Sequence, residues 1–191
     1  MTGDLIPAKV LATHTIANVS ETLAEKLGLP PQYRSIGLIT ADSDDVTYCA
    51  LDEATKAAAV EVVYGRSLYA GAANASTKLA GEVIGILAGP NPAEVQSGLR
   101  ACAEFMDSGV GFRSANEDDS ILYFAHTVSR TGTYLSKTAH VREGEALAYL
   151  IAPPLEAVVG LDEALKASDV ELAALFEPPS ETNFGGGLLT G

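Results

Sequence analysis

Short apolar runs of strand length alternate with stretches of helical spacing along the first half of the chain. The pattern predicts strands at 8–17, 35–41, 60–65 and 82–88, and helices at 20–27 and 52–58. Strands and helices mixed in this order, with helices covering a mainly antiparallel sheet, are typical of the α+β class.

A further helix begins just after the last of these strands. Asn91 is a good N-cap, Pro92 suits the first helical position, and Glu94 is spaced to reach back to the cap. We expect this helix to run to about Asp107 and to stop before Gly109.

The second half of the chain repeats the first. Residues 51–62 return as residues 161–172 at an offset of 110, with eight of the twelve positions identical. Upstream matches have an offset of 112, and the strand that ends at Gly89 returns at Gly191 with an offset of 102. A run of matches in the same order indicates a duplication. We therefore predict two tandem domains, 1–112 and 113–191.

The second copy stops at Gly191, where the first copy begins its capped helix. The second domain thus lacks the helix that residues 91–107 supply to the first. We expect the sequence to be a truncated form of a protein that continues into such a helix.

Composition narrows the classes of partner. The 191 residues are 47% apolar, enough for a packed core, and the net charge of −13 argues against nucleic acid and anionic membranes. No apolar run approaches the roughly 18 residues of a spanning helix, and the acidic N-terminus is unlike a signal peptide. A cytosolic location follows, in which Cys49 and Cys102 are expected to be buried free thiols.

Several motifs resemble the bacterial microcompartment (BMC) shell-domain family. A short helix leads through Ala54, Lys56 and Ala58 into Val60-Glu61-Val62, and the same arrangement recurs at Val170-Glu171-Leu172. Longer stretches resemble the tandem, circularly permuted shell proteins of ethanolamine utilisation. These stretches are 37–48, 62–72, 88–94, 129–132, 152–156 and 178–183.

The resemblance implies an assembly and a location. Three chains would supply six similar domains and form a flat pseudo-hexameric tile, because two repeats need only a threefold axis to make a ring of six. The expected location is the shell of a bacterial microcompartment, with lateral contacts to other shell proteins. The expected role is structural, with a gated central pore for metabolites or cofactors.

The two copies differ in the loop that precedes their last strand. The first copy's loop is eight residues longer and holds Tyr69 and Gly71, whereas the shorter loop holds Asn183. By resemblance these loops meet at the central axis, with Tyr69 as a plug and Asn183 at the rim. The alternative is an ordinary mobile surface loop.

The acidic stretch 42–45 is a second difference, because its counterpart near 152–156 is mostly apolar. Three carboxylates in four residues usually mark a solvated turn. The functional alternative is a cation site with Asp44, Asp45 and Glu82. By resemblance this region lines a small pore that binds ethanolamine, an ammonium ion at neutral pH, beside the aromatic ring of Phe112.

Other classes of function have less support. His14 and His126 occupy equivalent repeat positions, which favours a shared structural role over a catalytic one. The sequence also contains no catalytic or metal-binding spacing. We therefore expect that the protein is not an enzyme and has no catalytic residue, resident cofactor or metal. A ligand-sensing regulatory trimer outside any shell remains the alternative function. Passage of cobalamin through the central pore is also left open, since nothing in these residues specifies it.

Overall fold

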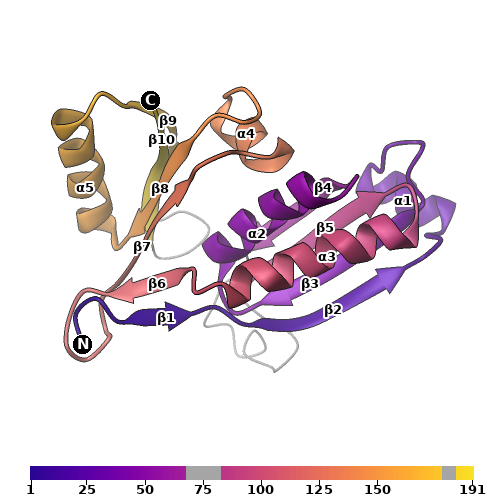
Figure 1. Cartoon of the computed structure of the whole chain (residues 1–191), viewed down its shortest axis with the longest axis horizontal. Coiled ribbons are helices and arrows are strands. Elements are labelled where there is room, and N and C mark those ends of the chain that lie inside the picture. The colour runs from indigo at the N-terminus through magenta and orange to yellow at the C-terminus, as the bar shows by residue number, and fades with distance from the viewer. Residues whose placement is uncertain (68–82, 178–183) are drawn as a thin grey trace. The chain divides into compact units, whose positions relative to one another are not determined.

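The computed structural model describes residues 1–67, 83–177 and 184–191 (Figure 1). These residues form two compact units. The first-repeat unit comprises Ala8–Ser108 together with Gly132–Tyr134. The second-repeat unit comprises Met1–Pro7, Gly109–Thr131 and Leu135–Gly191.

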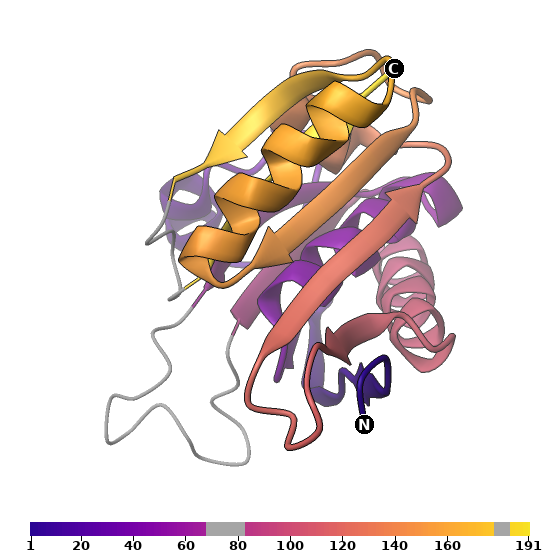
Figure 2. The same ribbon diagram turned by 90° about the vertical axis from the view of Figure 1, so that its left-hand side faces the viewer.

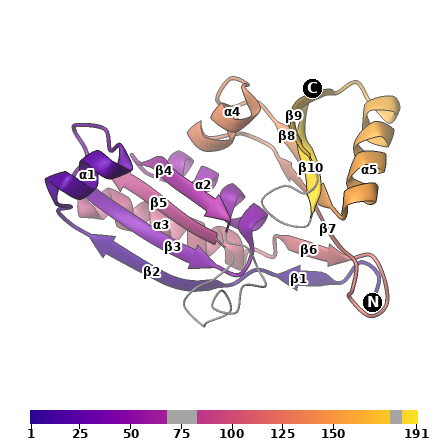
Figure 3. The ribbon, with the colours of Figure 1, turned by 180° about the vertical axis from the view of Figure 1, so that it is seen from behind.

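The first-repeat unit is a four-stranded antiparallel sheet with two long helices along one face (Figures 1 and 3). The strand order is β2-β3-β5-β4. Its strands are β2 (Val10–Ile16), β3 (Ser35–Ala41), β4 (Glu61–Ser67) and β5 (Val83–Gly89), and its helices are α1 (Glu21–Leu27), α2 (Asp44–Ala57) and α3 (Pro92–Asp107). The order of elements agrees with the prediction.

Strand alternation assigns side chains to the two faces of this sheet. Ile36 and Ile86 pack with Leu27 of α1 on one face. On the other face, a Cβ added to Gly37 would lie 2.6 Å from Val95 Cγ1 of α3. Glycine in the central strands therefore allows the long helices to approach the sheet closely.

The second-repeat unit holds a six-stranded sheet in the order β1-β6-β7-β8-β10-β9. Figure 2 shows α5 over this sheet, where it packs on β8 and β10. The strands are β1 (Leu5–Pro7), β6 (Gly111–Ser114), β7 (Leu122–Val128), β8 (Leu147–Ala152), β9 (Glu171–Phe176) and β10 (Gly185–Thr190), and the helices are α4 (Thr133–Ala139) and α5 (Pro154–Ala167).

Six elements of the first copy have a counterpart in the second, in the order that the repeat predicts. Strand β2 corresponds to β7, α1 to α4 and β3 to β8, each displaced by 112 residues in the sequence. Helix α2 corresponds to α5 and β4 to β9 at 110, and β5 corresponds to β10 at 102. The prediction of a duplicated α+β chain is confirmed.

Helix α2 is longer than predicted. It begins at Asp44 and not near residue 52, so the acidic stretch forms its first turn. Asp44 and Asp45 suit this position because carboxylates are stabilised near a helix N-terminus. Thr47, Tyr48 and Cys49 are poor helix formers and hid the first two turns in the sequence pattern.

The start of α3 agrees with the prediction in one detail and differs in another. Asn91 caps the helix by accepting a hydrogen bond from the N–H of Glu94 at 3.0 Å, and the helix ends at Asp107. The Glu94 carboxylate accepts a bond from the N–H of Ala59 at 2.8 Å, so it ties α3 to the end of α2.

The N-terminal strand β1 pairs with β6, which places residues 1–7 in the second-repeat unit. The predicted division between residues 112 and 113 follows the sequence repeat, and it stays a prediction about the two copies.

Candidate functional site

The acidic stretch is built into the start of α2. The Asp44 carboxylate accepts hydrogen bonds from the N–H of Asp45 at 2.9 Å and from the hydroxyl of Ser67. Asp45 is 6% exposed. Asp42 is exposed and accepts a bond from the N–H of Lys9 at 2.6 Å. The solvated-turn interpretation therefore fits Asp42 only, since the other two carboxylates belong to the helix.

Three strands of the sheet end or begin beside this turn. Ala41 at the end of β3 pairs with Val83 at the start of β5, and Val83 pairs with Ser67 at the end of β4. The hydroxyl of Thr40 donates to the carbonyl oxygen of Val83 at 2.8 Å. The candidate site thus lies at one end of the four-stranded sheet, where the ordered strands support the first turn of α2.

Ser43 is the N-cap residue of α2, yet its side chain makes no capping bond. Its Oγ atom is buried and has no hydrogen-bond partner among residues 1–67, 83–177 and 184–191. A buried hydroxyl without a partner costs free energy. Ser43 Oγ is therefore a polar atom at the acidic turn that could bind a polar ligand group.

The other predicted site residues divide into two groups. Glu82, Tyr69, Gly71 and Asn183 lie outside the described residues. Phe112 lies on β6 of the second-repeat unit, with its ring centroid 5.4 Å from that of Phe124 and 5.9 Å from that of Phe184. Its ring therefore belongs to an aromatic cluster within that unit.

The predicted free thiols are confirmed, and both are chemically protected. Cys49 and Cys102 are buried. Burial raises the pKa of Cys49 well above its usual value and raises the pKa of Cys102 to about 12. Neither thiol can act as a nucleophile near neutral pH, because the thiolate is the reactive form.

Metal chemistry finds no support in the described part of the chain, which holds no group of three or more potential ligands suited to a metal ion. His126 stacks on Phe124 with ring centroids 5.8 Å apart, consistent with a structural role.

Sequence reasoning missed one buried carboxylate. Asp52 is 1% exposed and accepts a hydrogen bond from the N–H of Gly132 at 2.7 Å. Its repeat counterpart Asp162 is exposed and pairs with Lys166. Because both copies have an aspartate at this position, the sequence alone could not distinguish the buried carboxylate from the exposed one.

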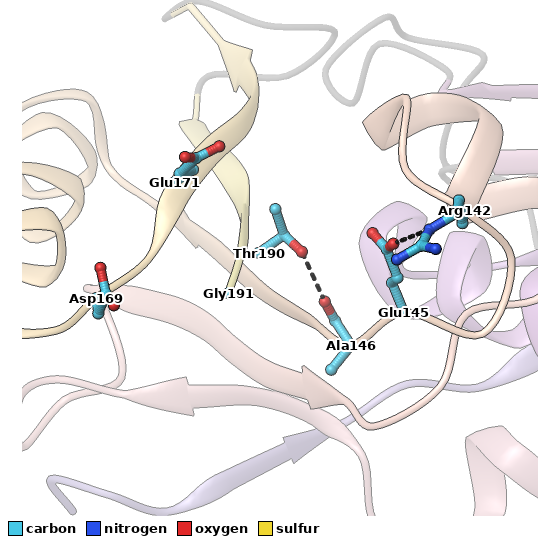
Figure 4. A pocket seen from close by; sticks show the side chains of 7 residues that line it. All are labelled: Arg142, Glu145, Ala146, Asp169, Glu171, Thr190 and Gly191. Atoms are coloured by element: carbon cyan, nitrogen blue, oxygen red, sulfur yellow. Dashed lines mark hydrogen bonds and ion pairs between the residues drawn. The ribbon is translucent and has the colours of Figure 1, made fainter.

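The second-repeat unit has an open pocket of about 510 Å³ (Figure 4). Glu145, Asp169 and Glu171 line it, and Arg142 is paired with Glu145 at 2.7 Å. The counterpart of Asp169 in the first repeat is Ala59, whose N–H is bonded to α3. The pocket in the second-repeat unit thus corresponds to the place that α3 covers in the first-repeat unit. We assign no ligand to this pocket.

Comparison with known proteins identifies the family. The BMC domain model matches residues 35–115. The shell protein EutL of Clostridium perfringens is 71% identical over 191 residues, which cover all of this chain and 88% of that protein. The chain belongs to the EutL family of bacterial microcompartment shell proteins. The resemblance found in the sequence is confirmed.

Solved structures agree with this assignment. EutL from Leptotrichia buccalis C-1013-b has a TM-score of 0.97 and 68% identity, covering all of this chain and 88% of its own. The trimeric shell protein PduB shares the fold at a TM-score of 0.76 and 21% identity, covering 94% of this chain and 78% of its own.

Membership of the EutL family decides the broad role. The chain is a structural component of a microcompartment shell and not an enzyme, because the EutL relatives are shell proteins. No helix in the described ranges is long and apolar enough to cross a membrane. The regulatory alternative has no observation that favours it.

Proposed function

We propose that three copies of this chain form a flat pseudo-hexameric shell tile with an ethanolamine site at the first turn of α2. The duplication supports the trimer, because two equivalent repeats per chain complete a six-domain ring around a threefold axis. The observation that carries the ethanolamine site is the acidic first turn of α2, where Ser43 Oγ adjoins Asp44 and Asp45 and has no partner among the residues that the structure describes.

The chemistry of this turn suits a small hydroxylated ammonium ion. Asp44 and Asp45 supply negative charge, and Ser43 Oγ can bond the ligand's hydroxyl or ammonium group. One ion pair at 4 Å contributes roughly 1–4 kcal/mol between water and a surface-like dielectric. Millimolar binding requires only about 4 kcal/mol, so these groups are sufficient for a weak sensing site. Glu82 would add a further carboxylate to the ligand set in this proposal, and the participation of Phe112 stays a prediction of the sequence.

The central pore belongs to the same proposal. Tyr69 and Gly71 in one loop, and Asn183 in the other, would form a gate at the threefold axis. Ethanolamine at the acidic site would shift the gate only if it binds the open and closed states with different affinities. Equal gate populations with and without saturating ethanolamine would contradict this coupling. Cobalamin remains a candidate for passage without a described residue that specifies it.

Calorimetric titration with ethanolamine tests the acidic site. We expect millimolar binding in the unaltered trimer, a loss of at least about tenfold in Asp45→Asn, and a smaller loss in Ser43→Ala. The matched control is Glu156→Gln, because Glu156 is a carboxylate in the first turn of the equivalent helix α5. Equal affinities in the Asp45 variant and the unaltered protein would remove the site, whereas light scattering tests the trimer separately.

A further inference from the structure

Ser67, at the end of β4, is bonded to the first turn of α2. Its hydroxyl donates a hydrogen bond to the carboxylate of Asp44, although 23 residues separate the two in the sequence. Strand β4 lies at the edge of the four-stranded sheet, beside β5 (Figure 3). The bond therefore joins the first residue of the helix to the last residue of an edge strand.

The Asp44 carboxylate also does what an N-cap side chain usually does. A serine at the N-cap typically accepts a hydrogen bond from the second or third N–H of the helix. In α2 the second N–H belongs to Asp45, and the Asp44 carboxylate accepts its bond at 2.9 Å. Asp44 thus satisfies one of the backbone donors that the N-cap residue Ser43 could otherwise satisfy.

The backbone of Ser43 is in the conformation of an N-cap residue, although its side chain makes no capping bond. Its φ of −141° and ψ of 125° are extended, as capping requires. Its carbonyl oxygen accepts bonds from the N–H of Thr47 at 3.3 Å and from the Thr47 hydroxyl at 2.5 Å. Only the direction of the Ser43 side chain therefore distinguishes the observed turn from a capped one.

Asp42 fixes the other end of this turn. Its carboxylate accepts a bond from the N–H of Lys9 at 2.6 Å, and its own N–H donates to the carbonyl oxygen of Lys9 at 3.1 Å. These bonds extend the pairing of β2 with β3 beyond Val10 and Ala41. Ser43 thus lies between two aspartates, each held by another segment of the chain.

We propose that Ser67 is a positioning residue for the acidic site. By holding Asp44 in its capping position, Ser67 keeps Ser43 Oγ out of the helix cap and available to a polar group of a ligand. This proposal rests on the ethanolamine site proposed above and adds the residue that keeps the site ready for its ligand. Ser67 acts through Asp44 and does not contact the ligand itself.

Capping and ligand binding compete for the Ser43 side chain. Its hydroxyl cannot point toward the helix N–H groups and toward a ligand at once, because χ1 occupies one staggered position at a time. Without the Ser67 hydroxyl, the half-buried Asp44 carboxylate could turn toward solvent. The N–H of Asp45 would then lack an acceptor, which the adjacent Ser43 hydroxyl could supply.

A double-mutant cycle in ethanolamine binding, measured by calorimetry on the full chain, tests this role. We expect Ser67→Ala to weaken binding about fivefold, the equivalent of one hydrogen bond. In a Ser43→Ala background the same replacement should change the affinity by less than about twofold, because Ser67 acts through Ser43. Ser67→Thr keeps the hydroxyl and should bind like the unaltered protein. Equal losses from Ser67→Ala in both backgrounds would overturn the proposal.

Ser35→Ala is the matched control. Ser35 is a buried serine at the opposite end of the same sheet, where its hydroxyl donates to the carbonyl oxygen of Ala17 at 2.7 Å. Its replacement also removes a serine hydrogen bond, but it should leave the affinity for ethanolamine unchanged. A loss of affinity in Ser35→Ala as large as that in Ser67→Ala would indicate general destabilisation and overturn the positioning role.

Thermal unfolding without ligand tests the hold on Asp44 independently of ethanolamine. Ser43→Ala should leave the Tm unchanged when Ser67 is present, but should lower it by about 2–4 °C in the Ser67→Ala background, where Ser43 serves as the cap. An unchanged Tm in that background would overturn the inference even if ethanolamine binds. A failure of the unaltered protein to bind ethanolamine, with the expected Tm changes, would overturn the proposed function and support the hold of Ser67 on Asp44.

Discussion

The carboxylate of Asp52 and the backbone N–H of Gly132 lie 2.7 Å apart, although 80 residues separate them in the sequence. Lys56 Nζ is 3.6 Å from the same carboxylate. A buried carboxylate is tolerated when hydrogen bonds and a cation compensate for lost hydration. Asp52 therefore fixes residues 132–134 onto α2.

Replacing Asp52 by Ala should lower the free energy of unfolding by about 3 kcal/mol, because the N–H of Gly132 would be buried without an acceptor. Urea unfolding at constant protein concentration measures the change. The exposed carboxylate Glu163 is the control, and its replacement by Ala should change the value by less than about 0.5 kcal/mol. Equal effects at the two positions would show that the bond to Gly132 contributes nothing.

The two long helices of the first-repeat unit differ in their caps, which gives a second prediction. Asn91→Ala removes the side-chain cap of α3 and should cost about 1 kcal/mol. Ser43→Ala removes a hydroxyl that makes no capping bond, so stability should stay unchanged or rise slightly. Thermal unfolding compares the two variants directly. A loss of stability in Ser43→Ala equal to that in Asn91→Ala would mean that Ser43 caps α2 after all.

The thiols should react slowly with a disulfide reagent until the protein unfolds. The pKa of Cys102 is raised from an ordinary 9.0 to about 12, which lowers its thiolate fraction about 1,000-fold at pH 8. Absorbance after addition of the reagent, with and without denaturant, measures this difference. Rapid reaction of both thiols in the folded protein would contradict their burial.

The same shift predicts an alkaline loss of stability. Between about pH 9 and pH 12 the unfolded thiol ionises while the folded thiol keeps its proton, so the unfolded state binds fewer protons. The free energy of unfolding should then fall by about 1.4 kcal/mol per pH unit for Cys102. Replacement of Cys102 by Ala should reduce this slope, although the cavity lowers stability at every pH. An unchanged slope would contradict the pKa shift.

Local pattern was enough to predict most of the fold. The strand positions, the Asn91 cap, the end of α3 and the burial of both thiols could be predicted, because each depends on residue type and spacing within a short window. The duplication could be predicted because the same short patterns return in the same order about 110 residues later. The family resemblance rested on motifs of the same kind. The early start of α2 was missed, since its first turns contain residues with low helix propensity.

Only tertiary structure decided which of two identical residues is buried. Asp52 and Asp162 stand at equivalent positions in two helices whose last seven residues match at six positions, and each has a lysine four residues later. Asp52 is covered because residues 132–134 fold back onto α2, whereas Asp162 remains exposed. Residue type and spacing within a segment determine whether that segment forms a helix. The burial of a side chain on the helix depends instead on which other segment of the chain packs against it. For that reason the sequence could reveal two equal copies, while their unequal surroundings appeared only in three dimensions.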